Sequence, residues 1–125
     1  MTRLDLLKKV KARKKQAGLT IDNIAKLSGL GNRTVTRFLA GEDVKISTVE
    51  KITELLGLDF AGNELVSVDE LQEQRAKEKA IYIVSLVQDT SSLEDQGLDK
   101  TQLNLLIKQA QESFLHEYKK SLWAA

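Results

Sequence analysis

The sequence predicts an all-α protein in which a helix-turn-helix head precedes a second helical region. Two observations support this prediction. Residues 20–41 contain two short apolar patterns at helical spacing, joined by a glycine turn, and the rest of the chain shows helix caps and apolar stripes with no segment that requires a strand. A chain of 125 residues holds one or two small domains. We expect a head in residues 1–58, a linker in 59–68 and a helical region in 69–125.

Two helices are expected before the glycine turn. The earlier one has the apolar residues Leu6, Leu7, Val10 and Ala17. The later one begins after Thr20, whose hydroxyl can accept a hydrogen bond from the amide of Asn23. Its residues Ile24 and Leu27 face inward, and Gly29 supplies the positive φ that a sharp exit from the helix needs.

The helix after the turn is predicted to bury Val35, Phe38 and Leu39, which are spaced three and four residues apart. This leaves four hydrogen-bonding side chains on the solvent side: Asn32, Arg33, Thr36 and Arg37. Arginine and asparagine pair bidentately with guanine and adenine edges, and each good pair contributes about 1–3 kcal/mol of discrimination. The segment is therefore typical of a helix that reads bases in the major groove, with an ordinary helical hairpin as the alternative.

The pattern in residues 19–41 is Leu-Thr-x-x-x-Ile-Ala-x-x-x-Gly-Leu followed by x-x-x-Thr-Val-x-Arg-Phe-x-x-Gly. It resembles the lambda-repressor-like, or XRE, family of helix-turn-helix regulators, and the similarity continues through residues 46–58. The resemblance implies that Asn32, Arg33 and Arg37 meet base edges, joined by Thr36. One departure is Ile21, which stands where the family often has a phosphate-binding Gln.

Charge divides the chain into two halves. Residues 1–58 contain twelve Lys and Arg against six Asp and Glu, a net charge of +6, whereas residues 59–125 contain seven against twelve, a net charge of −5. Phosphates are drawn to the first half, where the basic run 8–15 would steer the protein onto the duplex. The side chains expected at the DNA backbone are Thr20, Thr34, Lys45, Thr48 and Lys14.

Helix punctuation continues after the motif. Ser47 and Glu50 have the spacing of a capping box, and Gly57 stops the helix that they would open. Another helix should begin at Ser67 or Asp69 and reach about residue 88. Its β-branched residues 81–87 could form a strand by propensity, but strong helix formers lead directly into them, so we expect helix. The side chains available for its packing are Leu71, Ala76, Ala80, Ile83, Val84 and Val87.

The last quarter of the chain is predicted to form a short helical turn at residues 91–96, ended by Gly97, and then a long helix opened by Asp99. The stripe of the long helix is Leu103, Leu106, Ile107, Ala110, Phe114, Tyr118 and Leu122. Leu105, Leu115 and Trp123 lie off this stripe, so a second apolar face is expected to bind a partner. The residues expected at a dimer or partner interface are Leu103, Leu106, Ile107, Phe114, Tyr118 and Trp123. Packing of Trp123 within its own chain is the alternative.

Other classes of function have little support. The chain has no Cys, and the start of a zinc-protease motif at His116 lacks its second histidine, because that position is Lys120. The loop at Gly29 lacks the third glycine and the preceding strand of a nucleotide site. We expect no enzyme, metal or cofactor. The charged N-terminus and the absence of a long apolar run favour a cytoplasmic protein that does not enter a membrane.

The expected function is that of a sequence-specific DNA-binding transcriptional regulator. We expect a repressor that binds an inverted-repeat operator on double-stranded DNA as a homodimer, with the helical region 69–125 providing the dimerisation surface. The alternative is an antitoxin, since small proteins of the family that the chain resembles often have this role. Its C-terminal half would then neutralise a toxin, and DNA binding would regulate its own operon.

Overall fold

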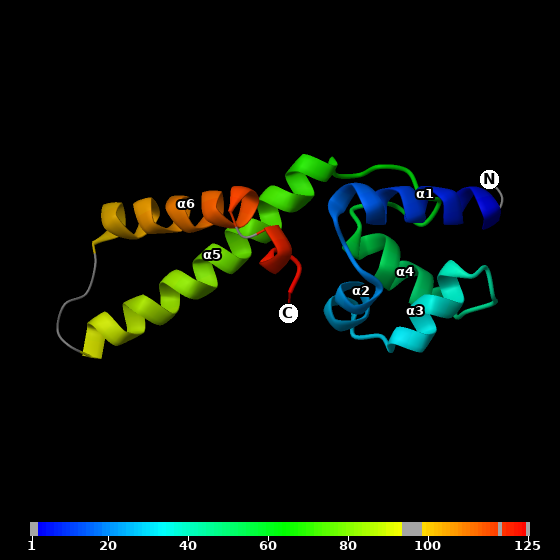
Figure 1. Cartoon of the computed structure of the whole chain (residues 1–125), viewed down its shortest axis with the longest axis horizontal. Helices are drawn as coiled ribbons and strands as arrows, with labels where there is room; N and C mark the ends of the chain where they lie inside the picture. The colour runs from blue at the N-terminus through cyan, green and yellow to red at the C-terminus, as the bar shows by residue number, and fades with distance from the viewer. Residues whose placement is uncertain (1–2, 94–98, 118, 125) are drawn as a thin grey trace. The chain divides into compact units, whose positions relative to one another are not determined.

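The computed structural model describes residues 3–93, 99–117 and 119–124, but not the side chains of residues 87–93. The helices are α1 (Arg3–Ala17), α2 (Ile21–Ser28), α3 (Asn32–Leu39), α4 (Ile46–Leu55), α5 (Val68–Leu93) and α6 (Lys100–His116), followed by the 3₁₀ turn η1 (Lys119–Ser121) (Figure 1). The described residues contain no strand beyond one isolated bridge between Leu58 and Glu64. The all-α prediction is confirmed. The chain forms two compact units, Met1–Leu71 and Gln72–Ala124.

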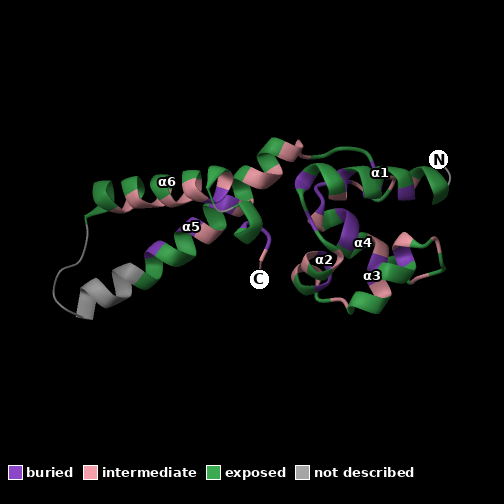
Figure 2. Cartoon of the chain, in the orientation of Figure 1, coloured by how far each residue is buried: buried purple, intermediate pink, exposed green. Residues whose placement is uncertain are grey.

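The first unit is built around a small apolar core. Helix α2 packs against α3 and α4, and the largest fully buried side chains are Val10, Ile24, Val35, Ile52 and Leu56 (Figure 2). Phe38 is also buried, as predicted, whereas Leu27 and Leu39 are half-buried. Helices of eight residues are marginal by themselves in water, so α2 and α3 depend on this core for their stability.

The turn between α2 and α3 forms as the sequence predicts. The Thr20 hydroxyl accepts a hydrogen bond from the Asn23 amide at 3.1 Å, and the Asn23 side chain accepts one from the Thr20 amide in return. Gly29 ends α2 with φ +72°, and the Leu30 amide bonds back to the Ala25 carbonyl at 2.9 Å. These local bonds satisfy orphan groups at both ends of α2.

The start of α4 differs from the prediction. The helix begins at Ile46 with Lys45 as its N-cap, so Ser47 lies inside the first turn and the predicted capping box with Glu50 is wrong. The reason is that the Lys45 carbonyl accepts a hydrogen bond from the Thr48 amide at 3.0 Å. This i→i+3 backbone bond satisfies one of the first amides of the helix and places the helix start before Ser47.

Residues 56–67 contain no helix, and they pack on α1. The buried Arg13 side chain, 6% exposed, forms an ion pair with Glu64 at 3.0 Å and donates to the Val66 carbonyl at 2.9 Å. Lys9 donates to the Asn63 side chain at 3.3 Å. Arg13 is thus directed inward, although it belongs to the basic run 8–15 that was expected to steer the protein onto the duplex.

Helix α5 begins directly after Ser67, one of the two predicted capping residues, and ends later than expected. The Ser67 hydroxyl accepts from the Glu70 amide at 3.1 Å, which makes Ser67 the capping side chain. The helix continues through residues 81–87, as predicted, and on to Leu93. Residues 91–93 therefore extend α5, since neither Gly nor Pro interrupts the helix before that point. Residues 94–97, the rest of the predicted separate turn, lie outside the described residues.

One face of α5 is buried. Ala76, Ala80 and Val84 are spaced four residues apart and are all buried, and Leu71 is half-buried. Ile83, which we expected to pack with them, is 40% exposed, because it lies at one edge of this face, about 60° around the helix from Ala80 and about 100° from Val84. The side chain of Val87 lies outside the described residues.

Helix α6 begins at the predicted cap and ends earlier than predicted. Asp99 accepts from the Gln102 amide at 2.8 Å, but the helix stops at His116, so Leu122 lies beyond it. The tail is held instead by α5, where Arg75 donates to the carbonyls of Leu122 at 2.9 Å and Ala124 at 2.7 Å. Lys79 of α5 also donates to the tail, to the carbonyls of Ser121 and Ala124, so two cationic side chains of α5 bind the tail carbonyls.

The close approach of the 56–67 loop to α1 can be tested at Gly62, which has φ +87°. A Cβ there would lie 3.0 Å from Lys9 Cδ and 3.3 Å from Lys9 Cβ. The control is Gly18→Ala, since Gly18 has φ +77° and its added Cβ would meet no described atom within 4 Å. The left-handed backbone alone should lower the free energy of unfolding by about 1–2 kcal/mol in both variants.

Gly62→Ala should lower the free energy of unfolding by about 1 kcal/mol more than Gly18→Ala, because a methyl group is added to a packed contact. Urea unfolding of both variants measures the difference. Equal losses would show that the loop does not press on α1.

Candidate nucleic-acid interface

The outer face of α3 is polar and open to solvent. The four predicted base-contacting residues occupy the first, second, fifth and sixth positions of the helix, and all four are exposed: Asn32, Arg33, Thr36 and Arg37. At 3.6 residues per turn, these positions fall within an arc of about 140°. Val35 and Phe38 lie on the other side and are buried, so α3 separates an apolar inner face from a hydrogen-bonding outer face.

A carboxylate of α2 lies beside the first residue of α3. Asn32 Nδ2 donates to Asp22 Oδ1 at 3.3 Å, while Asp22 Oδ2 forms an ion pair with Lys26 Nζ at 3.1 Å. The hydrogen bonds from Lys26 and then from Asn32 hold the pKa of Asp22 below its usual value. Asp22 therefore carries its charge at neutral pH, within contact of a predicted base-contacting side chain.

The last polar residue on the outer face of α3 is also paired. Arg37 Nε lies 3.6 Å from Glu42 Oε2, and the Glu42 amide bonds to the Arg37 carbonyl at 3.0 Å. Both side chains are about half-exposed, so water screens their attraction and the ion pair is weak. The Arg37 guanidinium remains accessible to a ligand that competes with Glu42.

A hollow of about 650 Å³ lies beside α3, where the α3–α4 turn meets the start of α4. Its lining includes three cationic side chains, Arg37, Lys45 and Lys51, and one acidic side chain, Asp43. Thr34, one of the residues expected at the DNA backbone, also lines it. Cationic groups and hydroxyls of this kind bind phosphate oxygens, so the hollow has the chemistry of a phosphate contact.

The residues expected at the DNA backbone do not all gather at this hollow. Thr34, Lys45 and Thr48 line it, but Thr48 is only 5% exposed, which leaves its hydroxyl little accessible to a phosphate. Thr20 is exposed and its hydroxyl caps α2. Lys14 is half-buried on α1 and is not among the residues that line the hollow.

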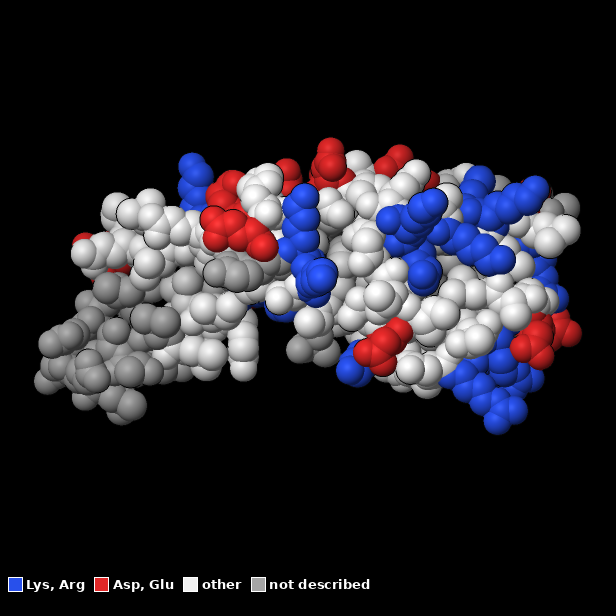
Figure 3. Space-filling model, viewed as in Figure 1, with Lys and Arg blue, Asp and Glu red and all other residues white. Residues whose placement is uncertain are grey.

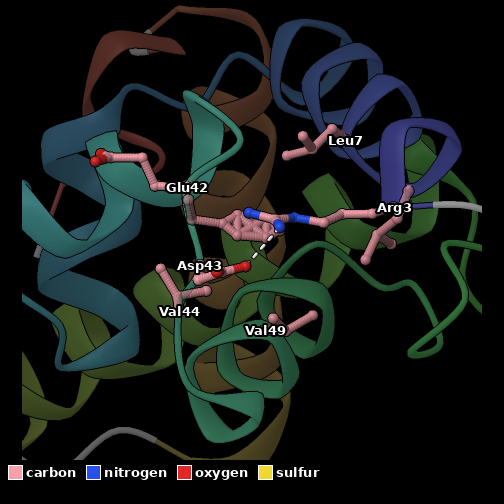
Figure 4. Close-up of a pocket in the computed structure, with 8 residues that line it drawn as sticks. Arg3, Leu7, Glu42, Asp43, Val44 and Val49 are labelled. Carbon is pink, nitrogen blue, oxygen red and sulfur yellow. Dashed lines mark hydrogen bonds and ion pairs between the residues drawn. The ribbon is translucent and has the colours of Figure 1, made fainter.

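An exposed ion pair lies at the turn that follows α3 (Figure 4). Arg3 Nη1 lies 2.6 Å from Asp43 Oδ1, and Arg3 Nη2 donates to the Gly41 carbonyl. Arg3 and Asp43 line a smaller hollow of about 180 Å³ together with apolar side chains that include Leu7, Val44 and Val49. The start of α1 thereby contacts the segment that leads to Lys45.

Surface charge distinguishes the unit that carries this face. On the side of the molecule drawn in Figure 3, most of the Lys and Arg surface lies over the part of the chain that contains α1 to α4. This agrees with the net charge of +6 in residues 1–58. Phosphate is therefore favoured at this unit.

The second unit exposes a different apolar surface from the predicted one. Phe114 and Trp123 are buried, at 8% and 4% exposed, and Leu103, Leu106 and Ile107 are half-buried, while Tyr118 lies outside the described residues. Among the residues of this unit that the structure describes, the large apolar side chains that are 40–65% exposed are Ile81, Tyr82, Ile83, Leu86 and Leu105. Of these, only Leu105 was expected at a partner surface.

Comparison with known protein families places a helix-turn-helix match in the first unit. The helix-turn-helix family model matches residues 10–63, which run from the middle of α1 through α4 into the following loop. Neither curated proteins nor solved structures gave a match. Among the described residues, no helix is long and apolar enough to cross a bilayer, and no cluster of three His, Asp or Glu side chains could hold a metal ion.

The cap that begins α2 can be tested at Thr20. Thr20→Ala should lower the free energy of unfolding by about 1 kcal/mol, because the Asn23 amide loses its acceptor. Thr20→Ser retains an acceptor oxygen and should stay close to the wild type. Chemical denaturation compares the variants, and equal stability of the alanine and serine forms would contradict the capping role.

Proposed function

Through residues 10–63 the chain belongs to the lambda-repressor-like, or XRE, helix-turn-helix family of DNA-binding transcriptional regulators, and we propose that it is a sequence-specific repressor acting as a homodimer. The observation that carries the proposal is the outer face of α3. Four exposed hydrogen-bonding side chains stand there on a helix whose opposite side is anchored in the core. The protein bound to its operator would block transcription from that site.

In this proposal, α3 lies in the major groove, and each of its polar side chains contacts the base whose hydrogen-bonding groups complement its own. Arg33 and Arg37 donate bidentately to guanine, and Asn32 both donates to and accepts from adenine. The Thr36 hydroxyl donates to the backbone carbonyl of Asn32 at 2.8 Å, and its oxygen can still accept a hydrogen bond from a base. Sequence preference arises from these four side chains.

Phosphate contacts set the register of the protein on the duplex. Lys45 and Thr34, at the hollow beside α3, bind the backbone next to the bases that α3 reads, with Lys51 as a further cation. Thr20 and Lys14 complete the proposed backbone contacts. Thr48 is left out because its side chain is buried.

The homodimer is supported by the apolar surface of α5. Tyr82 and Leu86 lie four residues apart on the side of α5 away from the buried Ala76, Ala80 and Val84. Adjacent exposed apolar side chains on one helix indicate an interaction surface. A second copy would bury this surface and bring two α3 helices to one operator.

The same surface also supports a second candidate function, that of an antitoxin. In that case the exposed α5 residues would bind a toxin, and operator binding would regulate the operon of the pair. The two candidates differ in the assembly state of the purified protein, which the second prediction below measures.

The first prediction concerns specificity, measured on an operator selected from random DNA. Arg33→Ala or Arg37→Ala should weaken operator binding by about 1–3 kcal/mol and relax the preference at one base position. Lys45→Ala should weaken binding to the operator and to scrambled DNA alike and lower the slope of log K against log salt by about one. Titrations at several salt concentrations separate the effects. Equal losses on both DNAs for the arginine variants would refute base contact.

The second prediction concerns assembly. Light scattering at tens of micromolar should give the mass of a dimer, and the selected operator should be an inverted repeat with half-sites about 10–10.5 base pairs apart. Leu86→Glu should shift the protein toward monomer, because it places a charge on the proposed interface. Gln74→Glu adds the same charge elsewhere on α5, at an exposed residue, and should leave the dimer intact. A monomeric wild type would contradict the homodimer.

A further inference from the structure

We propose that Asp22 is a positioning residue for base recognition: it fixes the orientation of the Asn32 side-chain amide so that α3 presents one N–H and the carbonyl oxygen as a pair suited to adenine. This inference rests on the proposed function, since it requires that α3 reads bases. Asp22 is on α2 and is not proposed to touch DNA. It acts through Asn32.

The orientation follows from hydrogen-bond chemistry. An ionised carboxylate only accepts hydrogen bonds, whereas a primary amide has two N–H donors on nitrogen and an acceptor oxygen. The nitrogen of Asn32, and not its oxygen, must therefore face Asp22, as the 3.3 Å contact between Nδ2 and Oδ1 has it. A flip of the amide would direct Asn32 Oδ1 at a carboxylate oxygen and would be repelled.

The carboxylate is itself held from the other side. Lys26 Nζ lies 3.1 Å from Asp22 Oδ2, one turn further along α2, so the two oxygens of Asp22 have separate partners. Bonds from Lys26 and Asn32 also lower the pKa of Asp22, so the acceptor stays ionised at neutral pH. Three side chains thus form a chain of contacts from α2 to the first residue of α3.

The groups left over on Asn32 match one base edge. After one N–H is bonded to Asp22, Asn32 retains one N–H donor and its carbonyl acceptor. Adenine presents N7 as an acceptor and its N6 amino group as a donor in the major groove, and this pair is the complement. With the amide free to flip, the donor and acceptor would exchange places, and the preference for adenine would fall.

Asp22 has a second effect of opposite sign. It is a negative charge beside the proposed DNA surface and repels phosphates of any sequence. Removal of the carboxylate should therefore raise affinity for scrambled DNA while it lowers discrimination at one base pair. A role confined to the stability of α2 would produce neither the gain nor a loss restricted to one position.

The experiment compares four variants by fluorescence anisotropy on the selected operator, on operators with single base pairs replaced, and on scrambled DNA. Asn32→Ala identifies the base pair that depends on Asn32. Asp22→Ala should lower discrimination at that base pair about five-fold or more, the low end of what one bidentate pair provides, and should bind scrambled DNA more tightly. Asp22→Asn also removes the charge, and its amide can donate to Asn32 as well as accept from it, so it no longer excludes the flipped amide and should lower discrimination at that base pair as Asp22→Ala does. Glu50→Ala, at an exposed acid of α4, should leave discrimination unchanged.

The outcomes separate the inference from the function on which it rests. If Asn32→Ala changes preference at no position, base recognition by Asn32 is wrong and the inference falls with it. If Asn32→Ala relaxes one position and Asp22→Ala does not, only the positioning role is overturned. A loss of discrimination in Asp22→Ala that is equal at all base pairs would assign the effect to charge and would also overturn it. Circular dichroism melts confirm that each variant is folded at the assay temperature.

Discussion

The geometry of the outer face of α3 depends on a core of five side chains. Val10, Ile24, Val35 and Ile52 come one each from α1, α2, α3 and α4, and Leu56 follows α4 directly. Full burial of each aliphatic side chain stabilises the unit by about 1.5–3 kcal/mol. Two of the helices have only eight residues, so neither would persist without the others. The spacing between α2 and α3, and with it the contact between Asp22 and Asn32, is set by packing on the opposite side of α3.

The sequence predicts those parts of the fold that local chemistry determines. The caps at Thr20 and Asp99 and the stop at Gly29 each involve residues within a few positions of one another, and all three appear as expected. Arg13 could not be distinguished from the rest of the basic run 8–15, which was expected to steer the protein onto DNA, because its partner Glu64 is far along the chain and carries no local signal. The end of α6 was misplaced for a similar reason, since Arg75 of α5 binds the tail.

In the candidate site, too, the sequence predicts the features that local chemistry determines and misses those that depend on residues elsewhere in the chain. Exposure of the four polar side chains of α3 follows from helical periodicity, because Val35 and Phe38 fix which side is buried. The acids that contact the face, Asp22 and Glu42, could not be assigned to it from periodicity. One lies across the turn on another helix, and the other lies beyond the end of α3. Their distance from the polar residues depends on how the chain bends at each point.

The loop after α4 illustrates how a segment of polar and glycine residues can share the dynamics of a core. Arg13 and Lys9 bond residues 63–66 to α1, and Gly62 lies against the side chains of Leu6 and Lys9. Such a loop cannot separate from α1 without exposing a buried guanidinium. Its amides should therefore exchange with solvent in the same cooperative opening as those of α1. A protease that needs an extended stretch of chain would find this segment only after the first unit has begun to unfold.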